Sequence, residues 1–222
     1  MKINRRQFVR NLGLGTASLS MGSLISTSSC APSGDSRDKR GKVSDDDQFL
    51  FIGDDIAIAQ TEYGKVQGYL LNHVYTFLGV PYGADTSGKN RFMPPQKPEP
   101  WTDVRPAVFY GNTAPQRMEN RWPNNYGTFA DHWNYWDVSE DCLYLNVWTP
   151  GIADGKKRPV LVWLHGGGFT NGSGIEQDGY HGENISREGD IVFCSINHRL
   201  GPIGFSDLSG VGGEAYKLSL IH

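Results

Sequence analysis

The sequence predicts an α/β domain, because two nearly continuous β-prone runs indicate strands at the centre of an α/β sheet. These runs, Pro159–His165 (PVLVWLH) and Ile191–His198 (IVFCSINH), lack the polar–apolar alternation of a half-exposed strand. Strands that helices bury on both faces have this composition. The intervening segment Gly182–Gly189 has room for one short helix. Hydrophobic residues make up 38% of the 222 residues and charged residues 20%, so a globular chain is expected rather than a disordered one.

Segments ahead of these runs predict hairpins and turns. Thr61–Leu71 alternates and contains two glycines, as a hairpin would. Val74–Val80 is a short apolar run that ends at Pro81, which predicts a strand stopping at a turn. Leu143–Trp148 predicts a further strand.

The long stretch between these strands predicts irregular structure. Asn90–Trp101 contains four Pro in 12 residues, which indicates an extended surface segment. Arg105–Trp136 has no clean periodicity and is expected to be a long loop. Its aromatic residues either pack the loop onto the body or line a substrate pocket, and packing is favoured; they are Trp122, Tyr126, Phe129, Trp133, Tyr135 and Trp136.

The first 47 residues are expected to be an export signal and a linker. Residues 1–30 begin with a basic segment that contains the pair Arg5-Arg6, which is typical of a twin-arginine export signal. The apolar stretch that follows is too short and too polar to span a membrane. Cys30 is a candidate for lipid attachment, and the alternative is simple cleavage near Ala31. Residues 31–47 are rich in Ser, Gly and charge and predict a disordered linker.

These features predict an exported protein of the periplasm or cell envelope, with a lipid anchor at Cys30 as its one expected membrane contact. Residues 1–42 carry a net charge of +6 and the remaining 180 residues a net charge of −9. An acidic body argues against a nucleic-acid binder, which needs a basic face. The three widely spaced Cys exclude a disulfide scaffold and a zinc site of the Cys-x-x-Cys kind. Neither a metal nor an organic cofactor is expected.

One local motif suggests chemistry: the run His165-Gly166-Gly167-Gly168-Phe169, directly after a predicted strand. Successive glycines leave backbone amides bare, and two such N–H groups aimed at one point can hold a developing oxyanion. The alternatives are a plain turn or a phosphate cradle. A phosphate loop would require Lys-Ser/Thr after the glycines, where this chain has Phe169-Thr170.

Several separated blocks occur in order and together resemble the amino-terminal part of the type-B carboxylesterases, the family of the cholinesterases and para-nitrobenzyl esterases. The resemblance extends from Ala57 to about Phe205, and its blocks are Phe77–Gly83, Arg91-Phe92, Ser139–Trp148, Pro159–Phe169 and Ile196–Phe205. It implies an incomplete α/β-hydrolase fold, made of an amino-terminal hairpin region and the first strands of the central sheet. Residues 48–222 would then be a truncated carboxylesterase domain, with 206–222 as a divergent tail.

The resemblance also implies a serine esterase that acts on small-molecule carboxylic esters, with Gly167 and Gly168 as oxyanion donors. Such an enzyme needs a serine on a Gly-x-Ser-x-Gly elbow, and the sequence contains no such motif. The nearest match, Gly172-Ser173-Gly174, lacks the first glycine. The acid and the histidine of the triad are likewise expected beyond Gly204, and no recognisable arrangement follows it. This chain is therefore expected to be inactive alone, and the alternative is a non-catalytic binding or adhesion member of the same fold.

The resemblance implies structural roles for a few further residues. Arg91 and Glu140 match a buried ion pair of the family, so contact between their side chains is expected. Cys142 has a disulfide partner in the family, but Ala114 stands at that position here, so Cys142 is expected to be a free buried thiol. Cys194, on its predicted strand, is expected to be free and buried as well. His165 and His198 are expected to pack rather than to catalyse.

Overall fold

The computed structural model describes residues 49–116 and 137–218, and all of them belong to one structural unit, residues 43–222. The expectations for the export signal, Cys30, the linker 31–47 and the aromatic residues of 117–136 lie outside the described residues. Within the described part of the chain, no helix is long and apolar enough to cross a bilayer.

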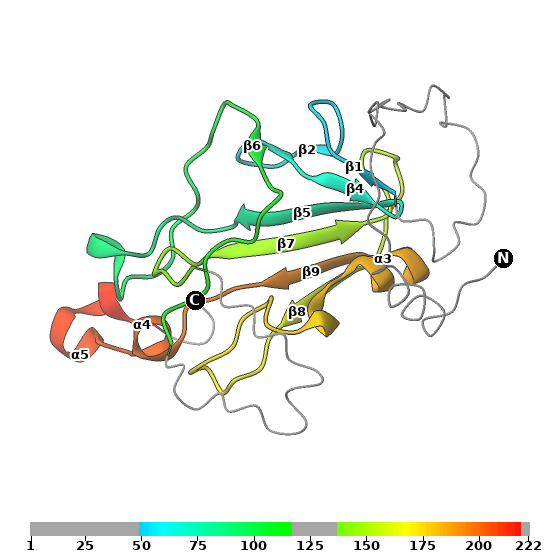
Figure 1. Cartoon of the computed structure of the whole chain (residues 1–222). Coiled ribbons are helices and arrows are strands. Elements are labelled where there is room, and N and C mark those ends of the chain that lie inside the picture. Colours follow the sequence, from blue (N-terminus) through cyan, green and yellow to red (C-terminus); the bar gives the residue numbers. More distant parts are fainter. Residues whose placement is uncertain (1–48, 117–136, 219–222) are drawn as a thin grey trace, which may run out of the picture. The chain divides into compact units, whose positions relative to one another are not determined.

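A six-stranded mixed sheet organises the described residues (Figure 1). Its strands follow the order β1-β4-β5-β7-β9-β8. Neighbours are antiparallel except β8 and β9, which are parallel. The bounds are β1 Leu50–Phe51, β4 Tyr69–Leu71, β5 Val74–Pro81, β7 Tyr144–Thr149, β8 Val160–Leu164 and β9 Val192–Ile196. All four strands predicted from apolar runs are confirmed to within two residues at each end.

A second, three-stranded sheet joins β2 (Ile58–Gln60), β3 (Lys65–Gln67) and β6 (Arg105–Pro106). The prediction of one hairpin over Thr61–Leu71 is wrong, because the chain changes sheets at Gly68. β3 pairs back onto β2, whereas β4 forms a separate hairpin with β5. A Cβ at Gly68 would collide with the carbonyl oxygen of Thr76, so only glycine permits this crossing. The first two residues of the predicted irregular loop form the strand β6 instead.

The strand β8 does not have the two-sided burial that its composition predicts. All five of its residues are exposed, with fractions between 38% and 64%. The reason is that, among the described elements, β8 ends the sheet and packs substantially only against β9, so no described helix covers its two faces. β9 behaves as predicted, because it lies between β7 and β8 and buries Phe193, Cys194 and Ser195.

Helix α3 (Glu183–Gly189) is the short helix predicted between the two long runs, and it packs against β5, β7 and β9. Its buried Ser186 donates a hydrogen bond of 3.0 Å from Oγ to the carbonyl oxygen of Trp148 on β7. Val74, Leu78, Trp148 and Phe193 form the apolar cluster of these strands. These contacts hold α3 against the sheet beside β7.

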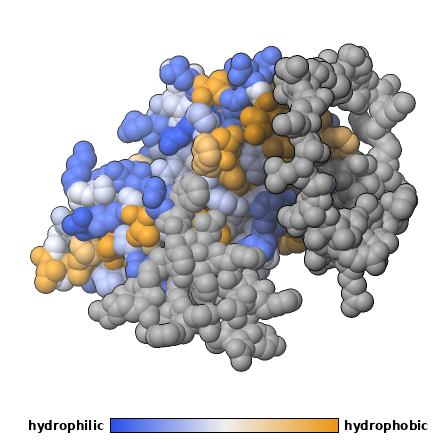
Figure 2. All heavy atoms as spheres, viewed as in Figure 1, coloured by the Kyte–Doolittle hydropathy of each residue, from blue (hydrophilic) through white to orange (hydrophobic). Residues whose placement is uncertain are grey.

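The remaining elements are single turns. Residues 91–101 contain no regular structure, as predicted for the proline-rich segment. Beyond β9 the chain forms three short helices, α4, α5 and η3. Figure 2 shows apolar side chains at the surface in the region where Figure 1 places α5. The short helices are η1 Gly88–Asn90, η2 Asp178–Tyr180, α4 Gly201–Phe205, α5 Ser209–Gly212 and η3 Glu214–Tyr216.

Candidate active site

The glycine loop leaves the end of β8 in a conformation that depends on its glycines. Gly167 has φ 117° and Gly168 φ 60°, both in the region that favours glycine. The amides of Thr170 and Asn171 donate to the carbonyl oxygen of Gly167 at 3.1 and 3.2 Å, which closes a tight turn. A Cβ at Gly167 would collide with the carbonyl oxygen of Asn171. The backbone therefore favours glycine at positions 167 and 168, whereas position 166 has no positive φ and has space for a Cβ.

The Gly167 and Gly168 amides carry the candidate chemistry. Among the described residues, none accepts a hydrogen bond from either amide. Both glycines are exposed. These N–H groups can therefore donate to a ligand.

Two histidine rings anchor the loop to the sheet. His165 follows β8 and is 8% exposed. Its ring stacks on that of His198, which follows β9, with centroids 4.5 Å apart and planes 4° apart. The Nδ1 atoms lie 2.8 Å from the carbonyl oxygens of the next residues, Gly166 and Arg199. Both rings thus have packing contacts of the kind that the sequence predicts.

A second anchor joins the far end of the loop to a distant segment. Gln116 accepts a 2.8 Å hydrogen bond from Gly172 N and donates one of 3.0 Å to Gly172 O. Ser173, the nearest match to a nucleophile, is 3% exposed, and its Oγ accepts a hydrogen bond from Ile175 N. A serine held in this way is not presented on an exposed elbow.

The expected Arg91–Glu140 contact is present, but the pair is not buried. Arg91 Nε lies 2.8 Å from Glu140 Oε1, and the side chains are 49% and 16% exposed. Arg91 directly follows the short helix η1, and its side chain lies at the surface. The ion pair with Glu140 is therefore partly exposed to solvent. Solvent screens such a pair, so its contribution to stability is about 1 kcal/mol or less.

Cys142 and Cys194 are both free and buried, as predicted. Burial raises the pKa of the Cys142 thiol to about 12 and that of Cys194 to about 11. Thiols with such pKa values are almost wholly protonated at neutral pH. Neither is suited to act as a nucleophile.

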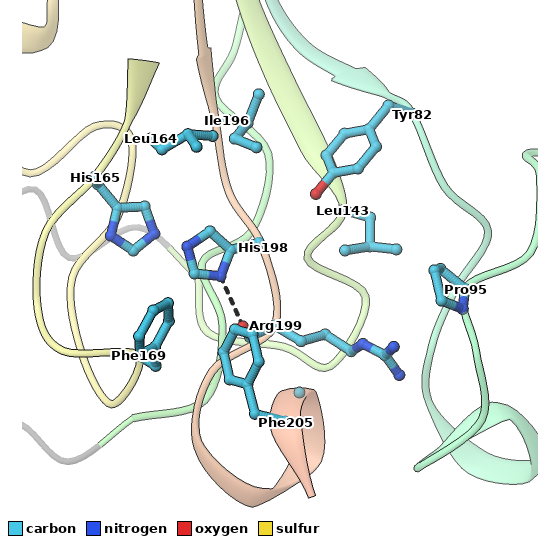
Figure 3. Close-up of a pocket in the computed structure, with 11 residues that line it drawn as sticks. Tyr82, Pro95, Leu143, Leu164, His165, Phe169, Ile196, His198, Arg199 and Phe205 are labelled. Atoms are coloured by element: carbon cyan, nitrogen blue, oxygen red, sulfur yellow. Dashed lines mark hydrogen bonds between the residues drawn. The ribbon is translucent and has the colours of Figure 1, made fainter. Parts of the chain in front are cut away.

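Sequence reasoning missed a cavity of about 420 Å³ that adjoins the loop (Figure 3). Its polar lining residues are Tyr82, His165, His198 and Arg199, and its apolar ones include Leu143, Leu164, Phe169, Ile196 and Phe205. One signal could have located it. His165 and His198 directly follow two runs predicted as neighbouring strands, and the carboxyl ends of parallel strands meet at one edge.

A mixed sheet with a glycine loop after a parallel strand defines the amino-terminal part of an α/β-hydrolase fold, and comparison with known proteins agrees. The carboxylesterase family matches residues 55–213. Phenmedipham hydrolase of Pseudarthrobacter oxydans is 45% identical over 157 residues, which are 71% of this chain and 30% of that protein. Para-nitrobenzyl esterase of Bacillus subtilis is 39% identical over 166 residues, 73% of this chain and 31% of that protein.

Solved structures give the same result. An esterase from Clostridium hathewayi matches with a TM-score of 0.69 at 36% identity, over 78% of this chain and 33% of that one. A carboxylesterase of Geobacillus stearothermophilus matches with a TM-score of 0.61 at 38% identity, over 72% of this chain and 30% of that one. The chain therefore belongs to the carboxylesterase family.

The chain spans about 30% of the length of the curated relatives it matches. The family match ends at residue 213, eight residues past Phe205. The tail as described folds back on itself through an isolated bridge between Asp207 and Lys217.

Proposed function

We propose that the protein to which this region belongs hydrolyses carboxylic esters, with the amides of Gly167 and Gly168 as the oxyanion hole. The observation that carries the proposal is the pair of successive amides after β8, neither bonded to an acceptor among the described residues. The turn is closed by other hydrogen bonds, so the two N–H groups remain available. Such preorganised donors can stabilise a negative charge that develops only during the reaction.

In acyl transfer, a nucleophile adds to the ester carbonyl and the π electrons move to the carbonyl oxygen. The Gly167 and Gly168 N–H groups stabilise that oxyanion, and its collapse breaks the C–O bond and releases the alcohol, which takes the proton that the base removed from the nucleophile. Water then adds to the acyl group on the nucleophile in the same way, which releases the acid and restores the nucleophile. Because the sequence has no Gly-x-Ser-x-Gly elbow, we infer that the serine, the acid and the base come from residues outside this chain. The 222-residue chain alone then turns over no ester.

The experiment translates the DNA that follows codon 222 in all three frames and expresses both the 222-residue chain and any longer product. Hydrolysis of p-nitrophenyl acetate is expected only from a longer product that contains the elbow. Turnover by the 222-residue chain would contradict the proposal that the serine, the acid and the base come from residues outside it. A gene with no elbow in any frame would favour the non-catalytic binding role instead.

Two glycines of one loop provide a matched pair of variants in the active product. Gly168→Ala adds a Cβ at φ 60°, which strains the turn, whereas Gly166→Ala adds one in open space without positive φ. Alanine keeps its backbone N–H, so Gly168→Ala acts by moving this donor away from the oxyanion position, and losing an oxyanion donor costs about 10²–10³ in kcat. We expect a loss of that order for Gly168→Ala and near-normal activity for Gly166→Ala, with both variants folded by circular dichroism. Equal activities would argue against the oxyanion role.

We further propose export to the periplasm or cell envelope through residues 1–30, with lipid attachment at Cys30. The paired arginines and the position of Cys30 after a mild apolar stretch support it. Metabolic labelling with a radioactive fatty acid should mark the wild-type chain and not the Cys30→Ala variant. Export without label would indicate simple cleavage.

A further inference from the structure

The dipeptide Asn171-Gly172 follows the glycine loop, and it is the only Asn-Gly pair in the 222 residues. Asparagine is one of the chemically labile residues of proteins. Its carboxamide is lost when the backbone nitrogen of the next residue attacks the side chain. A glycine in that next position hinders the attack least, because it has no side chain. Of the asparagines in this chain, Asn171 therefore has the most favourable sequence for deamidation.

Asn171 packs against a glycine that carries one of the proposed oxyanion donors. The Asn171 amide donates a hydrogen bond of 3.2 Å to the carbonyl oxygen of Gly167. The carbonyl oxygen and the Oδ1 atom of Asn171 both lie within 2.5 Å of the place that a Cβ at Gly167 would take. A charge on the Asn171 side chain would therefore lie next to Gly167.

Gln116 holds the nitrogen that has to make the attack. Gly172 is buried, and its N–H donates a hydrogen bond of 2.8 Å to Gln116 Oε1. Gln116 Nε2 donates a second bond, of 3.0 Å, to the carbonyl oxygen of Gly172. A peptide nitrogen must lose its proton and turn toward the side chain before it can attack, and these two bonds oppose both changes. The reaction therefore requires a local opening of this contact.

We propose that Asn171 is a deamidation site and that Gln116 controls the rate of its modification. The Gly172 nitrogen loses its proton and bonds to Asn171 Cγ, and the side-chain nitrogen takes up a proton and leaves as ammonia. Water then opens the five-membered imide. Cleavage of the new Cγ–N bond gives aspartate at position 171, whereas cleavage of the original peptide bond gives isoaspartate. Both products carry a carboxylate in place of the neutral carboxamide.

The carboxylate affects the site that the glycine loop forms. It repels the negative charge that an oxyanion brings to the Gly167 N–H, so it counteracts the stabilisation that this donor supplies. Isoaspartate in addition lengthens the backbone between Gly167 and Gly172 by one carbon atom. Deamidation is therefore expected to inactivate the esterase as the protein ages, a consequence that rests on the proposed function.

The test measures the modification by mass spectrometry, without any turnover. The 222-residue chain is incubated in mildly alkaline buffer, in parallel under native conditions and in urea, and then cut with trypsin. Asn171 and Asn184 stay in one peptide, because no Lys or Arg lies between Arg158 and Arg187. Asn184 is the internal control, since Ile185 follows it within α3. We expect the change from carboxamide to carboxylate at Asn171 and not at Asn184, about tenfold or more slowly in the native chain than in urea.

A pair of glutamine variants tests the role of Gln116. Gln116→Ala removes both hydrogen bonds to Gly172, so the native rate at Asn171 should rise about tenfold, toward the rate in urea. Gln60→Ala is the matched control, because Gln60 lies on β2 and its side chain bonds only to the neighbouring Thr61 carbonyl oxygen among the described residues. This variant should deamidate at the wild-type rate. The comparison of native and unfolded wild-type chain keeps the test valid if Gln116→Ala does not fold.

Three outcomes would overturn the proposal: no modification of Asn171 in urea, equal rates in the native and the unfolded chain, or a folded Gln116→Ala chain that deamidates at the wild-type rate. The consequence for activity is tested separately in the longer, active product. There Asn171→Asp should lower kcat for p-nitrophenyl acetate about tenfold or more, whereas the neutral Asn171→Ser should not. Because the modification is read by mass, its failure leaves the ester hydrolysis proposal untouched, and the reverse also holds.

Discussion

Replacing Ala114 by cysteine should create a disulfide with Cys142. The two residues share one buried cluster with Leu143 and Leu200, and both are at most 2% exposed. The backbone around them is held together, since Thr113 N donates to Asp137 O at 2.8 Å and Ser139 N to Thr113 O at 3.0 Å. A cysteine at position 114 therefore adds an Sγ atom to a Cβ that lies in the same buried cluster as the Cys142 side chain.

The expected gain follows from the loop that the bond closes. Positions 114 and 142 are 28 residues apart. Chain-entropy arguments then give a stabilisation of about 3–4 kcal/mol relative to the reduced chain. For a domain of this size, that corresponds to a rise in Tm of roughly 7–14 °C.

The assay compares Tm with and without dithiothreitol and counts free thiols after denaturation. Because the pKa of Cys142 is about 12 in the folded chain, the bond should form during refolding in a glutathione buffer rather than by air oxidation. Ala114→Ser is the control, since it makes a similar change in size and forms no bond. Four free thiols in the oxidised Ala114→Cys chain, or a Tm that dithiothreitol does not change, would refute the reasoning.

Three further perturbations test other parts of the fold. Asn146→Leu removes the acceptor of Gly79 N and the donor to Ser195 Oγ, so chemical denaturation should show a loss of about 2–4 kcal/mol; a loss under 0.5 kcal/mol would show that these groups find other partners. Burial lowers the pKa of His181, so the folded state binds fewer protons than the unfolded state, and stability should fall as pH drops below about 6.5. The His181→Gln variant should show a flatter pH profile of Tm, and an unchanged profile would exclude His181 as its cause. Val162→Lys charges an exposed residue of the terminal strand β8, so light scattering should show less aggregation, whereas Val74→Lys, at a fully buried position, should unfold the chain.

Much of the fold could be predicted because the signals are local. The apolar runs that become β5, β7, β8 and β9 are bounded by Pro or Gly, and their bounds follow within two residues. The free thiols were also predictable, because Ala114 stands where the resembling family has a cysteine.

The features that escaped prediction depend on neighbours distant in sequence. The composition of β8 is that of a buried strand, but exposure depends on which elements cover its faces, and among the described elements it packs substantially only against β9. Arg91 has the expected partner, but its burial depends on what covers η1.

The pairing of β5 with β7 also has a kinetic consequence. It joins Tyr75 to Thr149 and Pro81 to Tyr144, so more than 60 residues must be looped out before the centre of the sheet can form. The entropy of closing such a loop is lost before any contact compensates it, which places folding in the slow, non-local regime of milliseconds to seconds. α3 and β9 come later in the chain and dock onto β7, so the closure of this one loop sets the pace at which the whole sheet assembles.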